Sequence, residues 1–226
     1  MRAGNQVYER AGDIPATIPV FPLSGALLLP KVQLPLNIFE PRYMAMIDAA
    51  MRTERVIGMV QPRFDEPDGD EGDHPALCAV GCLGRVTTLQ ESGDGRYLIT
   101  LSGITRFRIE EELDTATPYR MCRITTEPFA SDLDEETEGA DVDRDAVLKA
   151  FGDYLAANDL EADWKSVREA SNEALVNTLA MMSPYGPAEK QALLEAANLK
   201  ERAETLVAIT EIELARSASD QTTTIN

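Results

Sequence analysis

Side chains with the chemistry to act as catalysts are sparse in this sequence. His74 is the only histidine, and it lies in an acidic segment rich in glycine and proline. Histidine is the usual general acid or base at neutral pH, so this supply is poor. Ser24, Ser102 and Ser183 would each need an adjacent base to act as a nucleophile, and Lys31 is near Ser24 only in sequence. We therefore expect no catalytic residues.

A nucleotide-driven activity is not expected either. A phosphate-binding loop needs a glycine followed by lysine and then serine or threonine, because backbone amides and the lysine must hold the triphosphate. The sequence contains no Gly-Lys pair. The motifs therefore predict no nucleotide site and no cofactor.

Acidic residues and cysteines are the remaining candidates for a chemical role. The formal net charge of −18 argues against nucleic acid as a partner, because phosphate binding depends on lysine and arginine. The acidic clusters at 65–73 and 132–145 lack the spacing of a calcium loop, so we interpret them as solvated segments. Cys78, Cys82 and Cys122 lie in apolar runs and are expected to be buried free thiols. We predict no metal site.

Prolines interrupt the apolar segment from Ile18 to Met51, which we expect to organise the fold. They are Pro19, Pro22, Pro30, Pro35 and Pro41. Because proline fixes φ and removes a backbone donor, this segment predicts short extended pieces. Its apolar side chains, Phe39 among them, are expected to be buried. After Pro41, the spacing of Met44, Ile47 and Met51 predicts the apolar face of a short helix.

Short strands and turns dominate the next part of the chain. The expected strands cover 55–61, 76–90, 97–102, 104–113 and 119–128. Gly81 and Gly84 indicate bends, Gly103 is expected to end a strand, and 92–95 is a hairpin turn. Strands at this spacing favour a small closed or half-closed β-barrel.

Helical periodicity replaces this pattern in the last third of the chain. The expected helices cover 147–155, 164–182, 187–197 and 199–214. Residues 1–16 are expected to be a frayed lead-in, and 217–226 a disordered tail. We therefore divide the chain into a β-barrel subdomain at 1–127, an acidic linker at 128–145 and a helical bundle at 146–226.

Several runs at fixed offsets resemble a known family. They are Phe21-Pro22-Leu23, Leu29-Pro30, Leu34-Pro35-Leu36, Ile38-Phe39-Glu40 and Arg42-Tyr43. In this order they resemble the start of the Lon substrate-binding domain, the N-terminal domain of ATP-dependent Lon proteases. Later runs extend the resemblance to about residues 18–214. It implies an α+β fold, with an N-terminal PUA-like β pseudo-barrel that includes one short helix, followed by a C-terminal α-helical bundle.

The resemblance also implies recognition without catalysis. With neither the ATPase motif nor a Ser-Lys protease module in the sequence, we expect a stand-alone Lon substrate-binding domain that is not a peptidase. The expected partner is an unfolded polypeptide or a partner protein, with a role as an adaptor in protein quality control as one hypothesis. A PUA-like RNA-binding module and a small-molecule-binding protein remain alternatives. No apolar run approaches the length of a membrane helix and no secretory signal is evident, so we expect no membrane partner and a cytoplasmic location.

An apolar groove between the barrel and the bundle is the expected polypeptide site. Its candidate lining residues are Leu36, Phe39, Tyr43 and Met59. Glu40 and Arg42 either form a polar edge of this groove or pair with internal partners to fix the start of the helix, which we favour.

Two further features allow a binding and a structural interpretation. Arg106 and Arg108 either contact acidic substrate or pair with carboxylates across the sheet, which we favour. For Trp164, we favour packing in the core or between domains over a role as an exposed substrate contact.

Overall fold

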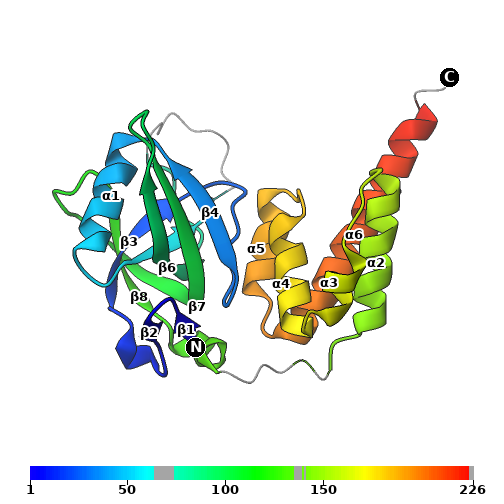
Figure 1. Ribbon diagram of the computed structural model, residues 1–226, viewed down its shortest axis with the longest axis horizontal. Helices are drawn as coiled ribbons and strands as arrows, with labels where there is room; N and C mark the ends of the chain where they lie inside the picture. The colour runs from blue at the N-terminus through cyan, green and yellow to red at the C-terminus, as the bar shows by residue number, and fades with distance from the viewer. Residues whose placement is uncertain (64–73, 135–138, 140, 224–226) are drawn as a thin grey trace. The chain divides into compact units, whose positions relative to one another are not determined.

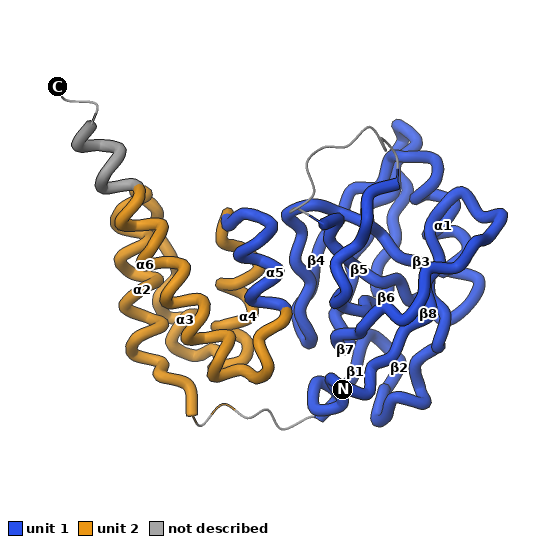
Figure 2. Tube along the Cα trace, turned by 180° about the vertical axis from the view of Figure 1, so that it is seen from behind, with its two compact units in different colours: residues 1–136, 185–194 blue, residues 137–184, 195–226 orange. Residues whose placement is uncertain are grey.

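The computed structural model describes residues 1–63, 74–134, 139 and 141–223, with side chains described as far as 216. Contacts within the chain divide it into two compact units (Figure 2). The first unit contains Met1–Glu136 and Tyr185–Leu194, and the second contains Thr137–Pro184 and Glu195–Asn226. The division into domains at residues 127 and 146 stays a prediction.

A six-stranded sheet forms the first unit (Figure 1). Its strands are β3 (Thr17–Pro22), β4 (Gln33–Ile38), β5 (Val56–Val60), β6 (Val80–Glu91), β7 (Tyr97–Leu113) and β8 (Arg120–Thr125). Their order is β4-β7-β6-β5-β3-β8, and an additional pairing between β7 and β8 closes the sheet. Only β3 and β5 are parallel among these pairs. The predicted barrel is confirmed.

The length of β7 makes this closure possible. Its first part, from Tyr97 to Ser102, pairs with β4, and its last part, from Arg108 to Leu113, pairs with β8. Register shifts occur between Leu83 and Gly84 and between Val86 and Thr88 on β6. Such irregularities increase the local twist that a sheet needs to curl into a barrel.

Glycines allow the barrel to pack closely around Phe107. A Cβ atom at Gly58 would lie 2.8 Å from the ring, and one at Gly81 would lie 2.5 Å from it. Gly103 has a similar role, because a Cβ there would lie 2.0 Å from the carbonyl oxygen of Leu29. The prediction that Gly103 ends a strand is therefore wrong, since β7 continues through it.

The N-terminal residues are ordered against the barrel, which corrects the expectation of a frayed lead-in. They form β1 (Arg2–Ala3), β2 (Gln6–Val7) and the 3-10 helix η1 (Ala11–Asp13). The Met1 ammonium donates to the carbonyl oxygens of Leu133 at 2.7 Å and Tyr8 at 3.1 Å. Tyr8 is buried in the same core cluster as Phe107.

The start of the expected acidic linker is also structured. Residues Glu127–Leu133 form the 3-10 helix η2, in which Phe129 and Leu133 are buried. The Asp132 side chain is nearly buried as well, because it pairs with Arg106. This part of the second acidic cluster is therefore not a solvated segment. The first cluster, at 65–73, lies outside the described residues.

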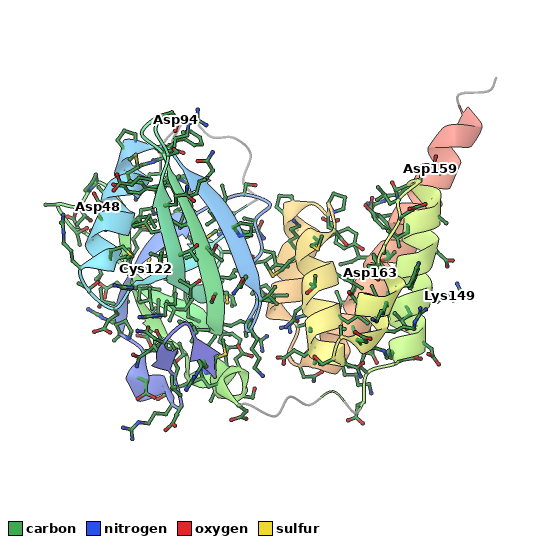
Figure 3. The ribbon with its side chains drawn as sticks, viewed as in Figure 1. Asp48, Asp94, Cys122, Lys149, Asp159 and Asp163 are labelled. Carbon is green, nitrogen blue, oxygen red and sulfur yellow. The ribbon has the colours of Figure 1, made fainter. Side chains whose placement is uncertain are left out.

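Helix α1 (Pro41–Met51) begins at a proline, as predicted. Its buried residues are Tyr43, Met46, Ile47 and Ala50. The predicted apolar face was correct only at Ile47, because Met44 and Met51 are half-buried. Figure 3 labels Asp48 on this helix, whose carboxylate accepts a hydrogen bond of 3.1 Å from the Tyr97 hydroxyl on β7.

Helix α5 (Pro187–Glu195) begins at the predicted proline, and most of it belongs to the first unit. The Gln61 side chain donates to the Pro187 carbonyl at 2.9 Å and to the Gln191 side chain at 3.1 Å. Lys190 donates to the Gly25 carbonyl at 2.8 Å. These buried polar contacts bind a late segment of the chain to an early one.

The second unit is helical, as the periodicity predicts. It contains α2 (Arg144–Ala157), α3 (Trp164–Glu169), α4 (Asn172–Met182) and α6 (Leu199–Thr223). The predicted helix over 164–182 is in fact two helices, because Ser171 caps α4 by accepting a 3.2 Å hydrogen bond from the Ala174 amide. Helix α6 continues to Thr223, so the expected disordered tail is wrong for residues 217–223. Residues 224–226 lie outside the described residues.

Candidate functional site

The six residues that the sequence singled out for polypeptide binding all lie in the first unit, but not in one place. Leu36 is on β4, and Phe39 and Glu40 follow that strand. Arg42 and Tyr43 are in the first turn of α1, and Met59 is on β5. Leu36 lines a groove on the sheet, Arg42 and Tyr43 line a pocket beside α1, and Met59 is in the interior, whereas Phe39 and Glu40 line neither hollow.

A groove of about 660 Å³ lies where three adjacent strands present matching segments. We call it the sheet groove, and it is lined by Pro35, Leu36, Asn37, Thr88, Leu89, Gln90, Leu98, Ile99 and Thr100. The register explains this composition, because Leu36 on β4, Ile99 on β7 and Leu89 on β6 form one row across the strands. Asn37, Leu98 and Gln90 form the next row, whose side chains point to the opposite face of the sheet.

Leu98 places an apolar side chain at the sheet groove, where it is 44% exposed. Its neighbours Ile99 and Leu101 are buried, and alternation along a strand puts Ile99 on the face opposite to Leu98. Leu36 and Leu89 lie in the row of Ile99, so their side chains share its face, although Leu89 is 37% exposed. The exposed side chain of Leu98 is therefore available to an apolar ligand. Sequence reasoning missed Leu98, and an apolar residue at a position where the alternation predicts a polar one is the signal that could have identified it.

Phe39 is the second apolar feature, and its exposure corrects the expectation that it is buried. Ile38 is 2% exposed, whereas the next residue, Phe39, is 61% exposed. Adjacent residues of an extended chain point to opposite sides, so burial of Ile38 turns Phe39 outward. The guanidinium carbon of Arg96 lies 5.7 Å from the centroid of its ring. Phe39 therefore presents its ring at the surface beside a cation.

A second hollow, of about 490 Å³, lies beside the start of α1. We call it the α1 pocket, and it is lined by Arg42, Tyr43, His74, Glu112, Leu113, Asp114, Thr115, Thr117, Pro118, Tyr119 and Arg120. The Arg42 side chain donates to Glu40 at 3.0 Å and lies over the Tyr43 ring, 4.7 Å from its centroid. Tyr43 is buried against Phe21, with 4.2 Å between the ring centroids. Of the two interpretations that the sequence left open for Glu40 and Arg42, the structure contains the internal pair.

Charged groups in the α1 pocket neutralise one another. Glu112 accepts hydrogen bonds from Arg120, and His74 Nε2 lies 3.2 Å from its carboxylate. The hydrogen bond from Arg120 is the main cause that lowers the pKa of Glu112 below its ordinary value. Arg120 also donates to the Pro75 carbonyl at 2.6 Å. The sole histidine therefore lies beside a carboxylate, and the described residues that line this pocket include no serine or cysteine.

Met59 does not reach either hollow. It is 3% exposed, and it pairs in register with Phe21 on the neighbouring strand. Its side chain contributes to packing in the interior. The structure therefore does not bring the four apolar candidates together: Leu36 lines the sheet groove, Tyr43 lines the α1 pocket, Met59 is in the interior, and the exposed Phe39 lines neither hollow.

Arg106 is structural, although not in the way we favoured from the sequence. It is 3% exposed, and its Nη2 donates to Asp132 of η2 at 2.9 Å, so the pairing is not across strands. Arg108 is exposed. Trp164, in the second unit, packs against Phe151 with 5.9 Å between ring centroids, yet 36% of it is exposed.

The described residues offer little for metal or thiol chemistry. Within the described ranges, no three His, Cys, Asp or Glu side chains come together where a metal ion could bind. Cys78, Cys82 and Cys122 are buried thiols that form no disulfide, as predicted. Burial, the main cause, raises the pKa of the Cys122 thiol to about 11 (Figure 3). None of the helices that the structure describes is both long enough and apolar enough to span a membrane.

Solved structures share this fold. The crystal structure of a Lon N-terminal domain protein from Xanthomonas campestris superimposes with a TM-score of 0.59 at 20% identity, covering 85% of this chain and 97% of that one. The N-terminal domain of Mycobacterium avium complex Lon protease gives a TM-score of 0.61 at 19% identity, covering 86% of this chain and 98% of that one. At these identities the likeness concerns the fold.

Sequence relatives are longer proteins. Lon protease 2 of Sorangium cellulosum is 30% identical over 202 residues, which cover 85% of this chain and 24% of that protein. The Lon protease of Parabacteroides distasonis is 31% identical over 206 residues, which cover 89% of this chain and 24% of that protein. The chain thus spans about a quarter of the length of these relatives.

The family comparison covers most of the chain. The match extends over residues 17–211, from β3 to the middle of α6, and it includes every strand of the barrel. It agrees with the runs around Phe21, Leu36 and Arg42 from which the sequence indicated the same relationship. The chain belongs to the ATP-dependent protease La (LON) substrate-binding domain family.

Proposed function

We propose that this chain binds exposed apolar segments of unfolded polypeptides without modifying them, as a recognition module in the cytoplasm. The observation that carries the proposal is the exposed apolar side chain of Leu98 at the sheet groove, together with the exposed ring of Phe39. Family membership supports it, because the family is described as a substrate-binding domain. We further propose that the chain acts as an adaptor, which delivers bound polypeptide to a separate partner.

The physical basis of this binding is burial of apolar surface on both partners. Leu98 and Phe39 are 44% and 61% exposed, so an apolar ligand that covers them removes unfavourable contact with water. The residues that line the sheet groove carry no ionisable side chain. A ligand can therefore enter without desolvating a charge, which would oppose binding.

The direct test is binding of a reduced, carboxymethylated protein that cannot fold, measured by fluorescence polarisation. The double variant Phe39→Ser, Leu98→Ser should weaken binding by at least about tenfold, since each position loses much of a buried apolar side chain. The matched control is Leu160→Ser in the second unit, because Leu160 is 51% exposed but lies outside the groove. Equal affinity of the double variant and the native chain would contradict the proposed surface.

Two further measurements separate this proposal from its alternatives. Structured RNA at low salt should not bind, in keeping with the net charge of −18. The purified chain should neither hydrolyse ATP nor cleave the unfolded protein. RNA binding that competes with the polypeptide, or turnover by the chain alone, would overturn the assignment as a polypeptide-binding module without catalysis.

A further inference from the structure

β4 is an open edge of the sheet. Among the six described strands of this sheet, β4 pairs only with β7, whereas every other strand has at least two partners because β7 also pairs with β8. Backbone groups on the far side of such a strand form a template for another extended chain. Every second residue of β4 presents its backbone N–H and C=O groups on this outer side.

The hydrogen bonds beside β4 show which of its backbone groups point away from β7. The Gly103 amide donates to the Val32 carbonyl at 2.9 Å, and this pair continues the register that joins Gln33 to Ser102. Hydrogen-bonded and non-hydrogen-bonded pairs alternate along an antiparallel ladder. Gln33, Pro35 and Asn37 are therefore the residues whose backbone groups point away from β7, and all three are exposed.

Pro35 fits this assignment independently. Proline cannot donate a ladder hydrogen bond, so it is tolerated in an edge strand where its nitrogen faces outward. Proline at this position also weakens pairing with unselected strands. The outward side of β4 therefore presents the backbone amides of Gln33 and Asn37 and the carbonyl groups of Gln33, Pro35 and Asn37.

We propose that β4 receives an extended segment of bound polypeptide as an additional strand of the sheet, with alternate apolar side chains of that segment entering the sheet groove. This inference rests on the proposed function and specifies how the polypeptide is held. Pro35 and Asn37 belong both to the open edge and to the groove lining, so one ligand strand can engage backbone and side chains together. Main-chain hydrogen bonds then supply affinity for any sequence, and the groove selects the apolar positions.

Charge complementarity defines the ligand more closely. The groove lining is uncharged, and the next residue of β6 beyond Gln90 is Glu91, which is exposed. Among the described residues, Glu91 forms no ion pair. Glu91 lies in the row of Ile38, at the end of β4 that leads to Phe39 and on the face opposite to Leu98. The favoured ligand therefore has uncharged apolar residues on the side of the strand that faces the groove and a lysine or arginine near this end on its other side.

Backbone methylation of the ligand gives the sharpest test, because it leaves the protein unchanged. The probe is a fluorescent peptide of alternating valine and threonine, flanked by lysines. Two versions carry N-methyl groups on alternate amides, one in each of the two possible phases. Strand addition requires that one version binds at least about tenfold more weakly than the unmethylated peptide, while the other binds about as well. Equal affinity of both versions would overturn strand addition, even if the unfolded protein still binds.

Hydrogen exchange of the full chain provides the second readout. Peptide binding should slow exchange of the Gln33 and Asn37 amides, while the Leu36 amide, already paired with β7, should change little. The Glu91→Gln variant should weaken binding of the lysine-flanked peptide and leave binding of a serine-flanked version unchanged. Binding without protection of Gln33 and Asn37 would contradict the proposal. Failure of both peptide and unfolded protein to bind would instead overturn the proposed function itself.

Discussion

Arg106 and Asp132 form a buried, two-pronged ion pair that joins β7 to η2. Arg106 Nε and Nη2 donate to the two carboxylate oxygens at 3.0 and 2.9 Å, and the side chains are 3% and 10% exposed. The Arg106 backbone amide also donates to Asp132 at 2.9 Å. The guanidinium lies over the Phe129 ring, 4.7 Å from its centroid. The pair therefore fixes the segment that follows the last strand.

Asp132→Asn should lower the free energy of unfolding by about 3–5 kcal/mol, because it leaves a buried guanidinium without its counter-charge. The matched control is Glu111→Gln, which removes the exposed pair of Glu111 with Arg123. That control should change stability by less than about 1 kcal/mol. Urea denaturation measures both, and equal effects would contradict a structural role for the buried pair.

Gly81→Ala should destabilise the first unit. The new Cβ would lie 2.5 Å from both the Met59 carbonyl oxygen and the Phe107 ring, so backbone and core must move, at a cost of about 1–3 kcal/mol or more. Gly93→Ala is the control, because nothing lies within 4 Å of a Cβ there. Thermal unfolding followed by circular dichroism should separate the two variants, and a melting temperature unchanged by Gly81→Ala would refute the close packing.

Phe39→Ala should separate binding from stability. The ring is 61% exposed, so its removal should change the free energy of unfolding by less than about 1 kcal/mol. Phe107→Ala should cost about 3–5 kcal/mol, because Phe107 is fully buried. Binding of the unfolded protein should weaken in Phe39→Ala. A large loss of stability in that variant would mean that Phe39 is buried.

Acid should weaken the β7–β8 pair through Glu112. The pKa of Glu112 is lowered mainly by its hydrogen bond from Arg120, so the folded state favours the carboxylate. The resulting stabilisation is present in full above the ordinary pKa of 4.5 and is lost as the pH falls through the lower, folded pKa. Glu112→Gln should therefore flatten the stability profile below pH 4.5, relative to the native chain and to Glu110→Gln. Identical acid profiles for the three proteins would contradict this contribution.

The cysteine thiols should resist modification in the folded chain. Cys122 is fully buried, and its pKa is raised to about 11, mainly by burial, so few thiolates form near neutral pH. Cys78 and Cys82 are buried too. A chromogenic disulfide reagent should modify none of the three rapidly in the native chain and all three in urea. Rapid modification of one thiol without urea would contradict this expectation and indicate local opening of the structure around that cysteine.

Much of the fold was accessible to sequence reasoning because it depends on local patterns. Strand alternation and the Ser92–Gly95 turn predicted the β6–β7 hairpin, and Pro41 and Pro187 predicted the starts of two helices. Features that depend on distant partners were not accessible. The N-terminal strands are held by the Leu133 carbonyl, and Gln61 bonds to α5, contacts that no local period reveals.

The candidate site was predicted only in part, for a related reason. Hydrophobicity indicates which residues favour burial, but a large share of any protein surface remains apolar. Phe39 was thus expected inside, although its immediate neighbour Ile38 takes the buried position. Met59 is the opposite case, because it was expected to line a groove but is buried. In a short apolar strand, the sequence alone does not distinguish a surface position from an interior one. The alternation of its strand could have marked Leu98 as an exposed apolar residue, but its place in a groove depends on the pairing of that strand with β4 and β6.

The first unit includes Tyr185–Leu194, so its fold cannot be completed before these late residues have been synthesised. Until those late residues emerge, the Gln61 amide lacks its acceptors at Pro187 and Gln191. The barrel of a nascent chain would therefore remain incomplete while the helices between the two parts of the first unit are synthesised. A chain truncated after residue 136 would lack both acceptors of the Gln61 amide altogether.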